Sequence, residues 1–152
     1  METLTEKTLA EALGVRPRPE AAAEVAGLAQ RAGGPSADAC DLGDEAALTR
    51  AVADAELVIN ATPLGMAGES LPDPCHRLGS GQIAYDLIYA PTQTPFLSDA
   101  GAAGAETHHG LSMLVGQAAA SYRRWIGRPA PRDTMSAAAL SALTHANTPD
   151  ST

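Results

Sequence analysis

The hydrophobic positions of the chain form short runs that are separated by segments with helical periodicity. Compact runs of β-branched and other apolar residues between polar flanks are typical of buried strands. Such runs predict strands near 56–61 and 82–88. A short third strand is predicted near 104–108, and a short stretch at 37–40 is a weak fourth candidate. Because helical segments lie between the strands, the three strands are expected to pair in parallel.

Helices are predicted where apolar residues recur every three or four positions and where proline or glycine marks an end. The strongest pattern covers 111–126, in which Leu114, Ala118 and Tyr122 share one face. Further helices are expected over 3–13, 19–32, 44–53, 95–103 and 133–145. The segment 62–81 is punctuated by proline and glycine and is predicted to be a long loop.

The alternation of helices and strands predicts an α/β fold with a parallel sheet. One domain is expected over 1–152, and its last residues, 146–152, are expected to form a flexible polar tail. Ligands of such sheets bind at the carboxyl ends of the strands, so polar residues at strand ends are the first candidates for a functional site. These candidates are Asn60, Thr62, Asp86 and Tyr89.

Composition narrows the classes of partner. The chain has 18 acidic and 10 basic residues and a net charge of −8, which argues against nucleic acid or an anionic membrane as a partner. No apolar run is long enough to span a membrane, and the polar N-terminus is no secretory signal. Cys40 and Cys75 are too few for a disulfide framework, so the cytoplasm is the expected compartment. No metal is expected, because the pairs Cys75-His76 and His108-His109 lack further ligands at a suitable spacing.

Three motifs follow one another in the second half of the chain. They are Asn-Ala-Thr-Pro-Leu-Gly-Met at 60–66, Tyr-Asp-Leu-Ile-Tyr-Ala-Pro at 85–91 with Thr-Pro-Phe-Leu at 94–97, and Gly-Leu-Ser-Met-Leu-Val-Gly-Gln-Ala-Ala at 110–119. In this order and spacing they resemble the C-terminal half of shikimate dehydrogenase, an NADP-dependent enzyme of aromatic amino-acid biosynthesis. The similarity extends from about Ala55 to Leu143. It implies a Rossmann-like nucleotide-binding domain and the interconversion of shikimate and 3-dehydroshikimate.

The resemblance also implies a cofactor side of the site. It places the first motif beside the nicotinamide, so Asn60 and Thr62 are predicted to bind the cofactor. It implies that the backbone of Leu87 faces the cofactor and that Gly110, just before a helix, contacts it. The structural alternatives are an ordinary exit from a strand for Asn60 and Thr62, and an ordinary helix-entry glycine for Gly110.

Two further residues are predicted to bind the substrate. The resemblance implies that Tyr89 reaches the carboxylate side of shikimate. Gln117 lies one helical turn after Met113, and its amide can both donate and accept hydrogen bonds, which suits a polyhydroxy substrate. A half-buried tyrosine and a surface glutamine are the corresponding alternatives.

The chain departs from the family pattern in its first part. Its one lysine, Lys7, does not match the family's catalytic motif, and no Gly-x-Gly-x-x-Gly turn occurs. We therefore expect a truncated Rossmann-like sheet without the first strand and the glycine-rich turn, no catalytic residue, and weak NADP binding. Arg16 and Arg18 resemble the basic turn that grips the 2′-phosphate of NADP, although they could be ordinary solvated charges.

A sheet without its first strands would leave the strand at 56–61 with an unpaired edge, which invites pairing with another chain. Self-association, or an N-terminal half supplied in trans, is therefore expected besides shikimate as a partner. Three functions stay open at this point. The chain is an oxidoreductase of the shikimate dehydrogenase type, a non-catalytic nucleotide- or partner-binding remnant such as a subunit of a split enzyme, or a truncated product with no settled function.

Overall fold

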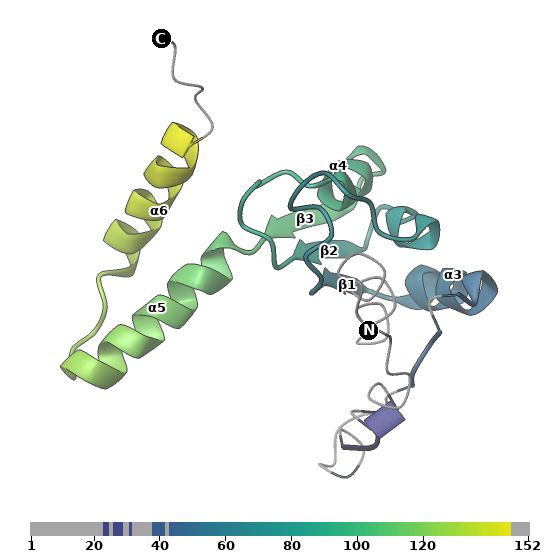
Figure 1. The fold of residues 1–152 in the computed structure, drawn as a ribbon, viewed down its shortest axis with the longest axis horizontal. Coiled ribbons are helices and arrows are strands. Elements are labelled where there is room, and N and C mark those ends of the chain that lie inside the picture. Colours follow the sequence, from purple (N-terminus) through teal and green to yellow (C-terminus); the bar gives the residue numbers. More distant parts are fainter. Residues whose placement is uncertain (1–22, 25, 29–30, 32–37, 42, 147–152) are drawn as a thin grey trace.

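Within the part of the chain that the structure describes, three short parallel strands form a sheet (Figure 1). The computed structural model describes residues 23–24, 26–28, 31, 38–41 and 43–146. The strands are β1 (Leu57–Asn60), β2 (Ile83–Asp86) and β3 (Glu106–His109), in the order β1-β2-β3. Asn60 lies opposite Asp86, and Asp86 lies opposite His109. The predicted α/β fold with three parallel strands is confirmed, and each strand is shorter than its predicted range.

The helices agree with the sequence pattern to within about two residues at each end. They are α3 (Glu45–Asp54), η1 (Asp73–His76), α4 (Pro95–Ala102), α5 (Leu111–Ile126) and α6 (Arg132–Ala146). The 3-10 helix η1 lies inside the segment that was expected to be loop only. The described residues between 23 and 31 are helical, as the helix predicted over 19–32 requires. The helix predicted over 3–13 and the tail residues 147–152 lie outside the described residues.

The weak strand candidate at 37–40 is wrong, because residues 38–40 belong to no strand. Alanine and aspartate have low strand propensity, and this stretch contains no β-branched residue. The segment instead leads into a turn before α3. Cys40 Sγ contacts the Asp41 carbonyl oxygen at 3.5 Å, and the Asp41 carboxylate accepts a hydrogen bond from the Gly43 N–H at 2.8 Å.

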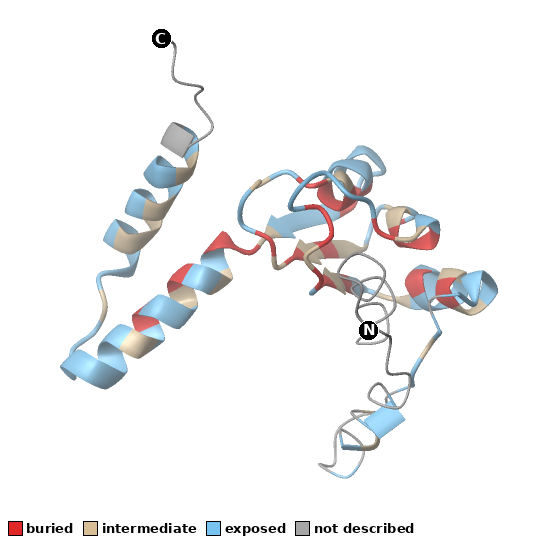
Figure 2. Cartoon of the chain, in the orientation of Figure 1, coloured by how far each residue is buried: buried red, intermediate tan, exposed pale blue. Residues whose placement is uncertain are grey.

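The main hydrophobic core lies on one face of the sheet, where α3, η1 and α4 pack (Figure 2). Alternate strand residues point to opposite faces, so Val58 and Ala84 enter this core. They meet the buried side chains Leu48, Val52, Cys75, Phe96, Leu97 and Ala100. On the other face, Leu57 is exposed while Ile59, Ile83 and Tyr85 are half-buried.

The last two helices form a hairpin that extends away from the sheet (Figure 1). Gly127 ends α5 with a left-handed φ of 72°, a conformation that glycine adopts without steric cost. α6 then packs against α5, and none of its described side chains is buried. Near the turn, Trp125 is 80% exposed.

Candidate functional site

The loop that follows β1 is built on two buried polar side chains. Asn60 Oδ1 accepts hydrogen bonds from the Thr62 N–H at 2.9 Å and from Thr62 Oγ1 at 2.7 Å. Thr62 Oγ1 in turn accepts from the Leu64 N–H at 3.0 Å, and Asn60 Nδ2 donates to the Leu64 carbonyl at 3.0 Å. Asn60 and Thr62 are only 2% and 5% exposed. Their polar atoms therefore hold the loop in shape from within.

The end of β2 carries a buried carboxylate with three donors. Asp86 Oδ1 accepts from Asn60 Nδ2 at 3.1 Å and from the Ile88 N–H at 3.0 Å. Asp86 Oδ2 accepts from Thr94 Oγ1 at 2.7 Å. A buried ionisable group is tolerated when it is hydrogen-bonded, and Asp86 is 0% exposed. The Asn60 contact joins the end of β1 to the end of β2 through side chains.

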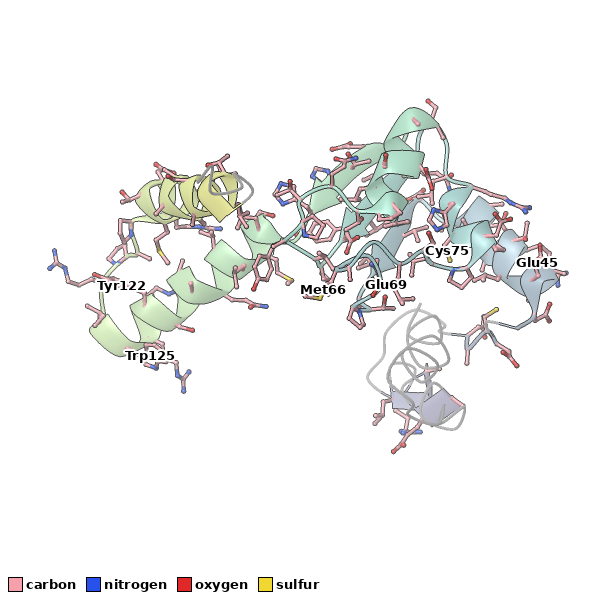
Figure 3. All side chains as sticks on the ribbon, turned by 45° about the horizontal axis from the view of Figure 1, so that its top comes forward. Glu45, Met66, Glu69, Cys75, Tyr122 and Trp125 are labelled. Carbon is pink, nitrogen blue, oxygen red and sulfur yellow. The ribbon has the colours of Figure 1, made fainter. Side chains whose placement is uncertain are left out.

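A tight turn continues the first loop. Gly65 has a φ of +109°, which favours glycine. Glu69 Oε2 accepts from the N–H groups of Gly65 at 3.2 Å and Ala67 at 3.0 Å. Hydrogen bonds from its own N–H and from those of Ala67 and Gly65 hold the pKa of Glu69 below its ordinary value. Met66, which lies between Gly65 and Ala67 in the sequence, is 59% exposed. Figure 3 shows Met66 and Glu69 on the same loop.

The start of α5 lies directly against the second loop. The Gly110 N–H donates to the Ile88 carbonyl at 2.9 Å, and the Leu87 N–H donates to the Asn60 carbonyl at 2.9 Å. A Cβ atom at Gly110 would lie 2.0 Å from the Leu87 carbonyl oxygen, so only glycine fits. The segments after β1, β2 and β3 therefore meet at one edge of the sheet.

A smaller polar cluster lies on the sheet face opposite the core. Tyr85 stacks on His108 with ring centroids 6.0 Å apart, and its hydroxyl lies 3.3 Å from Ser112 Oγ near the start of α5. His108 Nε2 lies 2.7 Å from Glu106 Oε1. Elsewhere, the two ring nitrogens of His76 contact Asp99 and the Leu71 carbonyl. Among the described residues, no group of three histidine, cysteine, aspartate or glutamate side chains could hold a metal ion.

The predicted site residues fall into two environments. Asn60, Thr62 and Gly110 are buried at the carboxyl edge and Leu87 is half-buried there. Tyr89 is 44% exposed, and Gln117 is exposed on α5. The predicted cofactor residues Arg16 and Arg18 lie outside the described residues.

Sequence reasoning missed two residues that shape this edge, Thr94 and Glu69. The pair Thr94-Pro95 signals a helix start, and Thr94 does accept from the Leu97 N–H as the N-cap of α4. Its bond to Asp86 has no signal in the sequence. Glu69 stands in a glycine-rich loop, where an acidic residue is unremarkable.

A parallel sheet whose carboxyl-edge loops meet in this way is a Rossmann-like α/β architecture, in which ligands bind at that edge. By sequence, the chain is related to the C-terminal portion of the NADP-dependent shikimate dehydrogenases. The family described as "Shikimate 5'-dehydrogenase C-terminal domain" matches residues 110–140. The shikimate dehydrogenase (NADP(+)) of Chlorobaculum tepidum is 38% identical over 106 aligned residues, covering 66% of this chain and 36% of that enzyme.

Solved structures support the same relationship. Shikimate 5-dehydrogenase from Listeria monocytogenes, solved with shikimate and NAD, is 31% identical with a TM-score of 0.62, covering 66% of this chain and 36% of that one. Quinate dehydrogenase from Corynebacterium glutamicum, solved with NAD, is 27% identical with a TM-score of 0.71, covering 81% and 43%.

The chain spans well under half the length of the curated relatives that it matches, with 36% and 37% covered in two of them. What those whole enzymes do is therefore a proposal for this chain. Within the part of the chain that the structure describes, no helix is long and apolar enough to cross a membrane.

Proposed function

We propose that this chain forms the nicotinamide-side part of an NADP-dependent shikimate dehydrogenase, which interconverts shikimate and 3-dehydroshikimate. The observation that carries the proposal is the meeting of the three motif segments at one sheet edge. Asn60, Asp86 and Gly110 join these segments by hydrogen bonds and by close backbone approach. The segments are the ones that resemble the family.

The surface of this edge suits a planar ring such as the nicotinamide of the cofactor. The side chains of Asn60 and Thr62 are buried and hydrogen-bond to each other. The outer surface of the loop is therefore formed by backbone and by the exposed Met66 side chain. We assign Asn60 and Thr62 the role of holding this loop beside the nicotinamide, and Leu87 and Gly110 the role of backbone neighbours of the cofactor. When bound, NADP+ supplies the acceptor for the hydride of the substrate carbinol.

Tyr89 and Gln117 are proposed to orient shikimate, with Tyr89 on its carboxylate side. Both side chains are accessible to a ligand. We assign both side chains hydrogen bonds to the substrate rather than the removal of its proton. The substrate hydroxyl must lose a proton as its hydride leaves, and a positioned acid–base group contributes about 10²–10⁴ in rate. The resemblance assigns that proton to a lysine and an aspartate of the substrate domain.

Turnover tests this proposal. NADPH formation from shikimate and NADP+ is measured at high protein concentration, first with the chain alone and then with the N-terminal half of a related enzyme added in trans. We expect activity only in the second case. Gln117→Ala should then raise the KM for shikimate about tenfold, whereas Arg124→Ala, two turns further along the same helix, should not. Robust activity of the chain alone, or none after complementation, contradicts the proposal.

Cofactor affinity tests it independently. Most phosphate contacts in such folds come from a glycine-rich turn at a helix N-terminus, and this sequence contains no such motif. We therefore expect calorimetry to give a dissociation constant weaker than micromolar, with NADP+ preferred over NAD+. The double substitution of Arg16 and Arg18 by alanine should remove that preference if the two arginines hold the 2′-phosphate. Preference for NAD+ would contradict this assignment.

A further inference from the structure

Thr94 lies where three parts of the candidate site meet, and its small side chain contacts all three. It is 1% exposed. Its Oγ1 donates to Asp86 Oδ2 at 2.7 Å and accepts from the Leu97 N–H at 3.4 Å, which caps α4. Its Cβ and Cγ2 lie 3.1 and 3.2 Å from the position that a Cβ would take at Gly65. The hydroxyl therefore serves β2 and α4, and the methyl group packs on the loop after β1.

Through Asp86, Thr94 is also linked by hydrogen bonds to the end of β1. Asp86 uses its other oxygen to accept from Asn60 Nδ2 and from the Ile88 N–H. Asn60 in turn fixes Thr62 by accepting its N–H and hydroxyl. Every member of this chain of hydrogen bonds is buried, so an unpaired group would keep a desolvation cost that water could not relieve. The loops at 62–66 and 87–94 and the start of α4 thus share one set of bonds.

We propose that Thr94 is a positioning residue for the cofactor and substrate site. Through Asp86 and Gly65 it sets the loop at 62–66 in a fixed relation to the loop at 87–94. The exposed side chains Met66 and Tyr89, one from each loop, are thereby held at a constant separation. Thr94 itself is buried, so it acts on a ligand through these loops. This inference rests on the proposed function of these loops in binding NADP(H) and shikimate.

The two functions of the side chain can be separated by substitution. Thr94→Val keeps the methyl group against Gly65 but removes the bond to Asp86 and the cap of α4. Thr94→Ser keeps the hydroxyl and removes only the methyl group. Asp44→Ala is the matched control, since Asp44 caps α3 by accepting from the Ala47 N–H at 2.9 Å and contacts neither loop in any of its hydrogen bonds.

The experiment measures amide hydrogen exchange and NADP+ binding in the full chain. We expect Thr94→Val to speed exchange of the Thr62 and Leu64 amides more than tenfold, and to weaken NADP+ binding by calorimetry about tenfold. Thr94→Ser should stay within about threefold of the wild type in both. Asp44→Ala also removes a helix cap and should lower stability in urea, but it should leave both quantities within about twofold. If Thr94 acted only by stabilising a helix, the two variants would change exchange and binding in the same way.

Equal exchange in Thr94→Val and Asp44→Ala would overturn the proposal. If Thr94→Val does not fold, hydrogen exchange of the wild-type chain tests the proposal. One cooperative opening with a common free energy should then expose four amides, those of Thr62, Leu64, Ile88 and Leu97. Separate opening free energies would overturn it. Absence of NADP+ binding by the wild type would contradict the proposed function instead, and the exchange data would still test the coupling.

Discussion

Gly110 occupies a position where the absence of a side chain decides whether two segments can touch. A Cβ there would lie 2.0 Å from the Leu87 carbonyl oxygen, and backbone cannot yield as a flexible side chain can. We expect Gly110→Ala to lower the free energy of unfolding by about 1–3 kcal/mol or more, the usual range for overpacking. Urea denaturation measures this loss in the free energy of unfolding. Gly79→Ala is the control, because nothing lies within 4 Å of its Cβ position, and an equal loss there would contradict this explanation.

Glu69 gives the loop after β1 a dependence on pH. Hydrogen bonds from backbone N–H groups lower the pKa of Glu69 in the folded protein. The folded protein therefore stabilises the ionised carboxylate more than the unfolded chain does. This contribution is present above the ordinary glutamate pKa of about 4.3 and is lost as pH falls through the folded pKa. The Gly65 and Ala67 amides should therefore exchange faster, after correction for intrinsic rates, once the pH falls below the lowered pKa of Glu69.

The matched variant for that experiment is Glu69→Gln, which keeps an oxygen acceptor but cannot ionise in this range. Its corrected exchange rates at Gly65 and Ala67 should not change with pH. The same acid-induced change in both proteins would mean that another group controls the loop.

At the residue scale, the sequence predicts where polar groups gather but not what they bind. Asn60, Thr62 and Asp86 are predicted near the carboxyl ends of strands because apolar runs give the approximate position of each strand. Their mutual hydrogen bonds depend on the register that pairs Asn60 with Asp86, which local sequence does not encode. The contact of Thr94 with Gly65 joins residues that are distant in sequence, so it could not be foreseen either.

At the scale of elements, helices were located more exactly than strands. The helix predicted over 111–126 has those bounds in the structure, because its apolar stripe and its closing glycine are both local signals. Strand ends depend on pairing, so β2 stops at Asp86 although the apolar run continues. The helix η1 escaped prediction since its four residues include two polar side chains and a proline, and are too few to show a period.

Among the longer helices, α6 is held by the least buried packing. It packs on α5, and none of its described side chains is buried. Local opening costs least where few apolar contacts hold an element. Amides in the middle of α6, such as that of Ala139, should therefore exchange at least tenfold faster than the amide of Ala100 in α4, which is 0% exposed. Mass-spectrometric or NMR exchange checks this, and equal protection would show that α6 is held by contacts beyond α5.

At the scale of the whole molecule, Cys75 offers a probe of global unfolding. It is 1% exposed in the main core, and burial raises the pKa of its thiol to about 11. Because the thiolate is the reactive form, Cys75 should resist a thiol reagent at pH 8 until the core opens. Its labelling rate should follow the unfolding equilibrium in urea, and Cys75→Ala identifies its signal against Cys40. Rapid labelling without urea would contradict the burial.

The order of the strands has a consequence for how the chain folds. Each strand pairs with the next one in sequence, and α4 contacts both strands that it connects. The unit β2-α4-β3 therefore forms within one continuous segment, 83–109, and low contact order favours rapid formation. We expect this unit to be the folding nucleus and the α5–α6 hairpin to form afterwards. In stopped-flow chevrons, Ala100→Gly in α4 should slow refolding, whereas Ala139→Gly in α6 should mainly speed unfolding. The reverse pattern would place the nucleus in the hairpin.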